Sequence, residues 1–196
     1  MLGHRPFILG LGGTPRSGSS TERALGVALA AAEAEGAETI LVSGADLLLP
    51  IYNPAEPDRT DSARRIVDLY RRADGIVIGS PAYHGSFSGL VKNALDYAED
   101  LRTDARPYFD GLAVGLVACA GGAQAASQTL AALRSVAHAL RGWPTPLGAT
   151  LNTALPLFDA EGRCVDPGAR FQLETVGQQV VQFSRMRQAA GCRMTG

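Results

Sequence analysis

Residues 10–21 read Gly-Leu-Gly-Gly-Thr-Pro-Arg-Ser-Gly-Ser-Ser-Thr, and the apolar run Phe-Ile-Leu at residues 7–9 precedes them. The apolar run has the length of a buried strand, and a helical pattern begins near Ser20. The first amides of a helix have no intrahelical acceptor, and the helix dipole is positive at that end. The strand, the turn and the helix together therefore predict an anion-binding site.

The side chains of this turn favour a phosphate as the anion. Arg16 supplies one guanidinium, and no acidic residue occurs before Glu22. Five residues supply hydroxyl groups: Thr14, Ser17, Ser19, Ser20 and Thr21. Because a phosphate monoester has three free oxygens that accept hydrogen bonds, this donor set suits it. A plain capping box of Ser19 and Glu22 is the alternative, but it does not account for Thr14, Arg16 or Ser17.

Two well-known phosphate-binding loops do not fit the same stretch. Gly13 and Gly18 have the spacing of the nucleoside-triphosphate loop, but the lysine that follows its second glycine is missing. The dinucleotide fingerprint requires a third glycine, and Pro15 stands at that position. The interpretation is therefore a phosphate monoester.

Composition and charge describe a single globular domain, which we expect to span residues 1–196. The chain is 46% hydrophobic, enough for one buried core, and its net charge of −1 gives no general attraction to nucleic acid or to an anionic membrane. No apolar run reaches membrane-spanning length. The three cysteines, at positions 119, 164 and 192, predict neither a disulfide framework nor a metal site, and they favour a cytoplasmic location.

Strand and helix patterns alternate along the chain. The expected strands are residues 7–12, 38–43, 75–80, 112–120 and 146–150. The expected helices are residues 21–35, 61–73 (capped by Asp61 or Ser62), 89–100, 124–140 and 171–190. Residues 49–60 and 153–167 are expected to be irregular. This alternation predicts an α/β architecture with a parallel sheet and right-handed crossovers.

Ligands of such sheets bind at the carboxyl ends of the strands, where three loops rich in Gly, Ser and Pro follow residues 12, 80 and 120. The second loop offers backbone amides to the edge of a flat heterocycle and the rings of Tyr83 or Phe87 to its face, although ordinary packing explains both aromatics equally well. His84 is a candidate proton donor, but a lone loop histidine is more often a spectator. Lys92 and Asp96 have the spacing of a solvated helical ion pair.

Residues 13–21 and 80–96 resemble the corresponding motifs of the NAD(P)H-dependent FMN reductase family. The second motif, Ser-Pro-Ala-Tyr-His-Gly-Ser-Phe-Ser-Gly-Leu-Val-Lys-Asn-Ala-Leu-Asp, is the more specific of the two. The resemblance extends over about residues 7–150 and is supported by the placement of Gly121 and Gly122. It implies a flavodoxin-like three-layer sandwich, with a five-stranded parallel sheet of order 2-1-3-4-5 and helices on both faces.

The resemblance implies a role in FMN binding for each loop. The residues implied for the phosphate are Thr14, Arg16, Ser17, Ser19, Ser20 and Thr21. The residues implied for the isoalloxazine ring are Pro81, Ala82, Tyr83, His84 and Gly85. Gly121 and Gly122 belong to the third loop, near the ring. Many members have serine where this chain has Thr14, and threonine keeps the hydroxyl.

The implied reaction is hydride transfer from NADPH or NADH to the flavin, followed by electron transfer to an acceptor. The acceptor classes left open are free flavin, a quinone, an azo compound and a metal oxyanion, and a flavin-dependent monooxygenase is a candidate partner. The flavin carries the chemistry, so no acid–base dyad is needed. The resemblance also implies a homodimer or homotetramer that shares the flavin site, for which Phe87, Tyr97 and Tyr108 are candidate anchors.

Two other classes of protein share this kind of sheet. A flavodoxin-like electron carrier without reductase turnover is the main alternative, but such carriers are usually strongly acidic and this chain is nearly neutral. A phosphatase or arsenate reductase with a Cys-x5-Arg loop is discounted, because the first loop has no cysteine and Cys119 has no arginine at that spacing.

Overall fold

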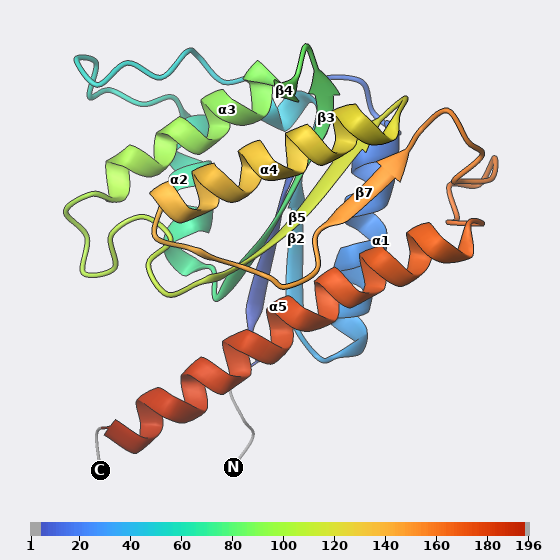
Figure 1. The fold of residues 1–196 in the computed structure, drawn as a ribbon. Coiled ribbons are helices and arrows are strands. Elements are labelled where there is room, and N and C mark those ends of the chain that lie inside the picture. Colours follow the sequence, from blue (N-terminus) through green and yellow to red (C-terminus); the bar gives the residue numbers. More distant parts are fainter. Residues whose placement is uncertain (1–4, 195–196) are drawn as a thin grey trace.

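A twisted parallel sheet crosses the middle of the molecule, in a computed structural model that describes the backbone of residues 5–194 and the side chains of residues 5–190 (Figure 1). The parallel strands are β1 (Phe7–Gly12), β2 (Glu38–Val42), β3 (Gly75–Tyr83), β5 (Ala113–Ala120), β6 (Trp143–Pro144) and β7 (Ala149–Asn152). The short strand β4 (Ser86–Phe87) pairs antiparallel with the end of β3.

The spatial order of the sheet is β2-β1-β3-β5, and β6 and β7 pair with successive parts of β5. Together, β6 and β7 occupy the place of the strand expected at residues 146–150. The predicted order 2-1-3-4-5 is therefore confirmed, whereas the bounds of the fifth strand were wrong. A tight turn interrupts that strand: the Thr145 hydroxyl donates to the Leu147 carbonyl at 2.8 Å, and Pro146 lies between them without an amide hydrogen to offer the sheet.

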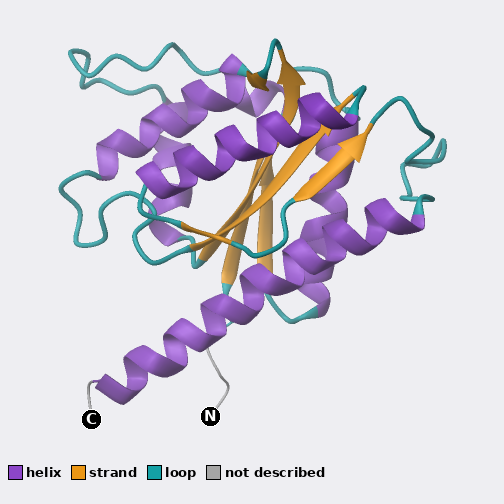
Figure 2. Cartoon of the chain, in the orientation of Figure 1, coloured by secondary structure: helices purple, strands orange, loops and turns teal. Residues whose placement is uncertain are grey.

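Helices cover both faces of the sheet (Figure 2). The helices of one face are α1 (Ser20–Ala34) and α5 (Pro167–Met194). The helices of the other face are α2 (Asp61–Arg72), α3 (Gly89–Asp96) and α4 (Ala123–Ala139). Neighbouring strand residues alternate between the two cores, so Ile8 and Val77 enter the first and Leu9 and Ile76 enter the second. Burial on both faces explains the continuous apolar runs in the sequence.

Helix α5 packs closely against its neighbours because glycines lie at its contacts, both in α5 and in the sheet. A Cβ atom added at Gly177 would lie 2.0 Å from the Ala28 carbonyl oxygen, so α1 and α5 cross in backbone contact. Atoms added at Gly75 and Gly115 would lie 2.5 Å and 2.6 Å from valine methyl groups of α5. The layer formed by α1 and α5 therefore packs closely against the sheet.

The cap of α2 and the ends of α3 and α5 differ from those expected, whereas the other helix bounds agree to within one residue. Thr60 caps α2, where its hydroxyl accepts a hydrogen bond from the Ala63 amide at 3.3 Å, so the expected caps Asp61 and Ser62 were wrong. Helix α3 changes to a 3-10 turn, η2 (Tyr97–Leu101). Helix α5 starts before residue 171 because Pro167 suits a first helical position and the preceding Asp166 accepts from the Ala169 amide at 2.6 Å.

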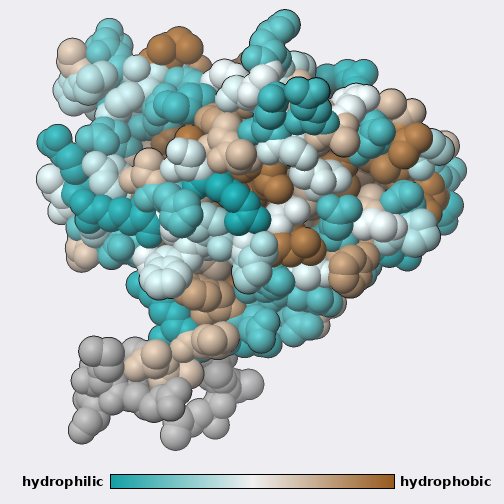
Figure 3. All heavy atoms as spheres, viewed as in Figure 1, coloured by the Kyte–Doolittle hydropathy of each residue, from teal (hydrophilic) through white to brown (hydrophobic). Residues whose placement is uncertain are grey.

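The remaining segments agree with the sequence interpretation. Residues 49–60 form no helix or strand, and residues 153–166 contain only an isolated bridge between Phe158 and Cys164. A short 3-10 turn, η1 (Gly44–Leu47), follows β2. Within the described residues no helix is both long and apolar enough to cross a bilayer. On the face seen in Figure 3, apolar side chains form scattered patches among polar ones.

Candidate functional site

The first loop leaves the sheet at a point where only glycine fits. Gly12 has φ 140°, and a Cβ atom there would lie 1.8 Å from the Gly79 carbonyl oxygen of β3. The next residue, Gly13, donates its amide hydrogen to that same oxygen at 3.3 Å. The two strand ends therefore touch, and the chain turns directly above them.

The start of α1 is capped largely as its sequence indicates. The Ser19 hydroxyl accepts a hydrogen bond from the Glu22 amide at 3.3 Å. The Glu22 carboxylate does not return to the Ser19 amide, as a capping box requires, but accepts from the Gly18 amide at 3.0 Å. This leaves the amides of Ser20 and Thr21, in the first helical turn, without an intrahelical acceptor.

The Arg16 guanidinium is available for a ligand, and hydroxyl groups lie beside it in the loop. The Arg16 side chain is exposed and forms no ion pair within the part of the chain that the structure describes. Thr14 donates to the Arg16 carbonyl at 3.2 Å, which holds the loop closed while leaving the guanidinium unengaged. The cation, the hydroxyls and two free amides thus meet at the positive end of α1, a donor set that fits a phosphate.

The second loop is a hairpin, where the sequence had indicated an open loop. Strand β3 continues to Tyr83, and Ala82 and Tyr83 pair with Phe87 and Ser86 of β4. The two residues between them, His84 and Gly85, have φ 49° and 85°, which is the geometry of a type I′ turn. Such turns favour Asn-Gly and Asp-Gly, so His-Gly gave no hairpin signal.

Buried serines fix the base of this hairpin. The Ser80 hydroxyl is fully buried, accepts from the Ser88 amide at 2.9 Å and donates to the Pro81 carbonyl at 2.8 Å. The Ser88 hydroxyl in turn accepts from the Val91 amide at 3.2 Å and caps α3. The exposed side chain of Tyr83 is therefore presented by a rigid element.

A cavity of about 250 Å³ joins the three loops at the carboxyl end of the sheet. The expected site residues that line it are Thr14, Arg16, Ser19, Ser20, Thr21, Pro81, Ala82, Tyr83 and Gly121. The expected site residues outside its lining are Ser17, His84, Gly85 and Gly122. Ala120, where the expected third loop begins, lines it as well, and so do Cys119 and Thr153, for which the sequence carried no signal. The loop order predicted from the sheet thus brings distant segments to one place.

Cys119 is an inert thiol at the floor of this cavity. Burial raises its pKa to about 11, while the nearby Thr21 hydroxyl acts in the opposite direction. The group is therefore a thiol at neutral pH, and it is not an activated nucleophile. This agrees with the sequence argument against Cys-x5-Arg phosphatase chemistry.

The third loop leaves open space at the cavity rim. Gly122 precedes α4 in an extended conformation, and no side chain caps the helix there. Cβ atoms added at Gly121 or Gly122 would meet nothing within 4 Å among the described residues. The loop is therefore not packed against the rest of the protein at these glycines.

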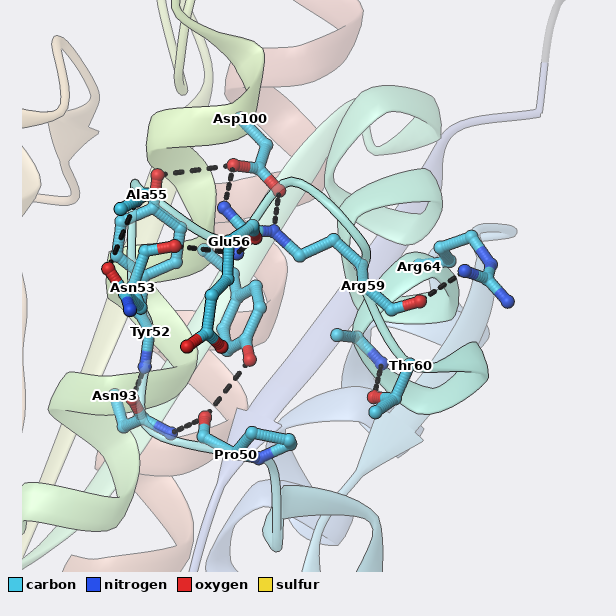
Figure 4. A network of polar contacts seen from close by, with 12 residues as sticks. Pro50, Tyr52, Asn53, Ala55, Glu56, Arg59, Thr60, Arg64, Asn93 and Asp100 are labelled. Carbon is cyan, nitrogen blue, oxygen red and sulfur yellow. Dashed lines mark hydrogen bonds and ion pairs between the residues drawn. The ribbon is translucent and has the colours of Figure 1, made fainter.

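Residues 48–60 form a further loop at this end of the sheet, separate from the three loops around the cavity and built around Arg59 (Figure 4). The Arg59 guanidinium donates through Nε and Nη2 to both carboxylate oxygens of Asp100, each at 2.8 Å, and it stacks on the Tyr52 ring at 4.6 Å. The hydrogen bonds from Arg59 are the first cause of a lowered Asp100 pKa. Asn93 accepts from the Tyr52 amide at 2.8 Å and donates to the Pro50 carbonyl at 2.9 Å.

One expected interface anchor lies inside this network. The Tyr97 side chain is buried, and its hydroxyl donates to the Pro50 carbonyl at 3.0 Å, so its use as an interface anchor was wrong. Phe87 and Tyr108 are half-buried. The exposed ion pair of Lys92 and Asp96, with 2.5 Å between nitrogen and oxygen, is present as expected.

A larger cavity, of about 460 Å³, lies between α1 and α5. Its lining is mainly alanine and valine from α1 with Arg170, Glu174 and Gln178 from α5. Arg170 and Gln178 are donors there, but no residue with a hydroxyl group lines the cavity and Glu174 adds a negative charge, so it suits a phosphate less well than the smaller cavity does.

Comparison with known proteins adds independent information. A family model described as NADPH-dependent FMN reductase matches residues 6–154. An FMN-dependent NADPH-azoreductase of Staphylococcus aureus (strain USA300) is 42% identical over 98 residues, which are 48% of each chain. This chain therefore spans about half the length of the curated relatives it matches.

Solved structures share the fold at low sequence identity. The flavoenzyme NAD(P)H:(acceptor) oxidoreductase FerB from Paracoccus denitrificans superposes with a TM-score of 0.77 at 21% identity, covering 92% of this chain and 98% of that one. A flavodoxin, WrbA-like protein from Agrobacterium tumefaciens superposes with a TM-score of 0.61 at 19% identity, covering 92% and 98%. These similarities confirm the expected flavodoxin-like architecture.

Proposed function

Because this chain belongs to the NADPH-dependent FMN reductase family, we propose that it is a flavoprotein oxidoreductase that takes hydride from NADPH or NADH. FMN is the proposed cofactor, bound at the cavity that joins the three loops. We further propose that residues 1–196 form one domain with a single FMN site.

The observation that carries this proposal is the donor set at the start of α1. Arg16, the hydroxyls and the free amides of Ser20 and Thr21 match the needs of a phosphate monoester. At about 250 Å³ the cavity is smaller than the pockets of about 300–1,000 Å³ that usually enclose such ligands. Part of the cofactor would therefore lie at the open rim, near Tyr83 and Gly121, where a second substrate has access.

When bound, the flavin would accept hydride from the nicotinamide and pass the electrons to the acceptor. The chain holds the phosphate with Arg16 and the α1 amides, and it presents the Tyr83 ring and the hairpin backbone beside the rim. The thiol of Cys119 stays protonated and takes no part. His84 lies in the hairpin turn, so we give it a structural role and do not propose it as a proton donor.

The acceptor we favour is an azo compound, because the curated relatives include azoreductases. Free flavin and a quinone are the competing acceptors, and a flavin-dependent monooxygenase is a candidate consumer of reduced flavin. A flavodoxin-like carrier without turnover is less favoured, since a net charge of −1 provides little attraction for a basic partner.

The assembly we propose is a homodimer or homotetramer in which a second copy covers the open rim of the cavity. Exposed apolar side chains near this end of the sheet, including Ile51 and Tyr83, are consistent with such contact. Light scattering at micromolar concentration tests this, and a monomer mass that persists with FMN present contradicts it. The free thiols of Cys119 and Cys164 agree with the cytoplasm as its location.

The deciding experiment is the absorption spectrum of the purified protein with added FMN, before and after NADPH under anaerobic conditions. A reductase bleaches the flavin band within seconds, and an azo dye then restores it. A carrier binds FMN but leaves NADPH unoxidised. Protein that does not alter the FMN spectrum or fluorescence contradicts the proposal altogether.

A further inference from the structure

Glu22 is the acidic residue at the start of α1, beside the expected phosphate position. Its carboxylate accepts a hydrogen bond from the Gly18 amide at 3.0 Å, and its own amide donates to the Ser19 hydroxyl at 3.3 Å. Ser19, Ser20 and Thr21, which lie between Gly18 and Glu22 in the sequence, all line the cavity. A carboxylate thus already occupies one amide of the anion-binding turn.

The charge of Glu22 is not neutralised locally. Glu22 takes part in no ion pair within the described part of the chain, and neither does Arg16. Arg23 is the nearest cation to Gly18, because its Nη2 atom would be 3.9 Å from a Cβ added there, but its Nη1 atom donates to the Asp159 carbonyl at 3.4 Å and not to Glu22. Glu22 therefore keeps an unpaired negative charge in the first turn of α1 among the described residues.

A phosphate bound at the Ser20 and Thr21 amides would lie within one turn of this carboxylate. Both anions are favoured by the same positive helix end, so they compete for it. Charges at such separations near a protein surface still interact appreciably. Riboflavin has no phosphate and would not experience this repulsion.

We infer that Glu22 sets the FMN affinity of this site: its charge opposes the phosphate, so that FMN exchanges with solvent as a substrate instead of remaining permanently bound. This inference rests on the proposed function. The hydrogen bond to Gly18 has a separate effect, because it orders the loop for any ligand. Charge and hydrogen bond are separable by substitution, since glutamine keeps an acceptor for the Gly18 amide and alanine does not.

The test compares FMN and riboflavin binding by flavin fluorescence in wild type, Glu22→Gln and Glu22→Ala, with FMN release measured by stopped flow. Glu22→Gln is expected to tighten FMN binding about three- to tenfold and to slow its release, with riboflavin affinity unchanged. Glu22→Ala is expected to weaken riboflavin because the loop loses its brace. Glu38→Gln, an exposed acid in β2 at the opposite end of the sheet, is the matched control and leaves both affinities unchanged.

The ratio of FMN to riboflavin affinity decides the outcome. A ratio in Glu22→Gln that equals or falls below the wild-type ratio overturns the inference, even when FMN binds well. Wild-type protein that binds neither flavin overturns the proposed function first, and the inference with it. A ratio that rises equally in Glu38→Gln shows a general charge effect and also contradicts a specific role for Glu22.

Discussion

The phosphate loop, residues 12–19, and the loop of residues 48–60 lie at the same end of the sheet, and each contains one arginine of interest. In the loop of residues 48–60, Arg59 is bound to both oxygens of Asp100, stacks on Tyr52 and has a side chain only 13% exposed. In the first, Arg16 is exposed and unpaired among the described residues. An arginine whose donors are already used supports the fold, whereas one held beside free amides is available for a ligand.

The largest expected effect concerns the backbone of the phosphate loop. Gly12→Ala places a methyl group 1.8 Å from the Gly79 carbonyl oxygen, so the strand ends must separate. We expect a loss of about 3–5 kcal/mol in the free energy of unfolding, measured by urea denaturation, together with loss of FMN binding. Gly26→Ala, at an exposed site on α1 with open space around it, is the control and should be neutral or stabilising.

Breaking the Arg59 network should affect stability and spare the ligand. Asp100→Ala leaves a largely buried guanidinium without its carboxylate, and we expect a loss of about 2–4 kcal/mol in the free energy of unfolding. FMN affinity should stay within about twofold of wild type if the two loops differ in role as described. A selective loss of FMN affinity in a stable Asp100→Ala protein would contradict the comparison.

The same ion pair predicts a pH dependence. Because the Asp100 pKa is lowered from its ordinary value of 3.8 by Arg59, its contribution to stability is complete above that value and declines as the pH falls through the lowered pKa. Wild type should therefore lose stability below about pH 4 more steeply than Asp100→Ala does. Urea denaturation at pH 3 and pH 7 measures this difference, and equal losses in both proteins would refute it.

The converse change should affect the ligand and spare the fold. Arg16→Ala removes a charge-assisted hydrogen bond worth about 1.5–3 kcal/mol, so FMN affinity should fall about tenfold to a hundredfold. Riboflavin affinity and the free energy of unfolding should remain close to wild type. Fluorescence titration with both flavins provides the measurement, and an equal loss for both would show that Arg16 does not contact the phosphate.

The smallest effect is expected in the hairpin turn. Asparagine tolerates a positive φ, so His84→Asn keeps the turn at φ 49°, and hydride transfer to a flavin needs no side-chain acid. Turnover with NADPH should stay within about tenfold of wild type at equal flavin occupancy. A hundredfold loss would instead make His84 a proton donor and extend the functional region to the tip of the hairpin.

The sequence predicted the fold well where periodicity and glycine placement carried the information. The apolar runs of β1, β3 and β5 gave a parallel sheet, the family resemblance gave the strand order, and the loops that follow the strands gave the place of the site. The hairpin was missed because His-Gly is not a usual type I′ turn. The Arg59–Asp100 pair was missed because residues 41 apart acquire meaning only once the chain has folded.

Among the predicted site residues, the structure separates those that line the cavity from those that shape it. Ser17, His84, Gly85 and Gly122 lie outside the lining, and the last three form a turn or a helix start. The sequence did not predict Cys119 and Thr153 as site residues, because their positions follow from strand register rather than from a motif. Both residues line the cavity because the parallel ladder places the ends of β5 and β7 side by side, and the Thr153 amide, just after β7, donates to the Ala120 carbonyl at 2.7 Å.

The close packing of α5 on the sheet and on α1 has a consequence for the synthesis and folding of the protein. Every strand of the sheet leaves the ribosome before α5 does, yet α5 covers Val77 and Val117 and touches α1 at Gly177. Until α5 is synthesised, all strands of the sheet are present in the nascent chain, but α1 is the only one of the two helices of that face available to cover its apolar side chains. Such exposed apolar surface makes an incomplete chain prone to aggregation, so we expect this interval to be the one in which the protein is most vulnerable.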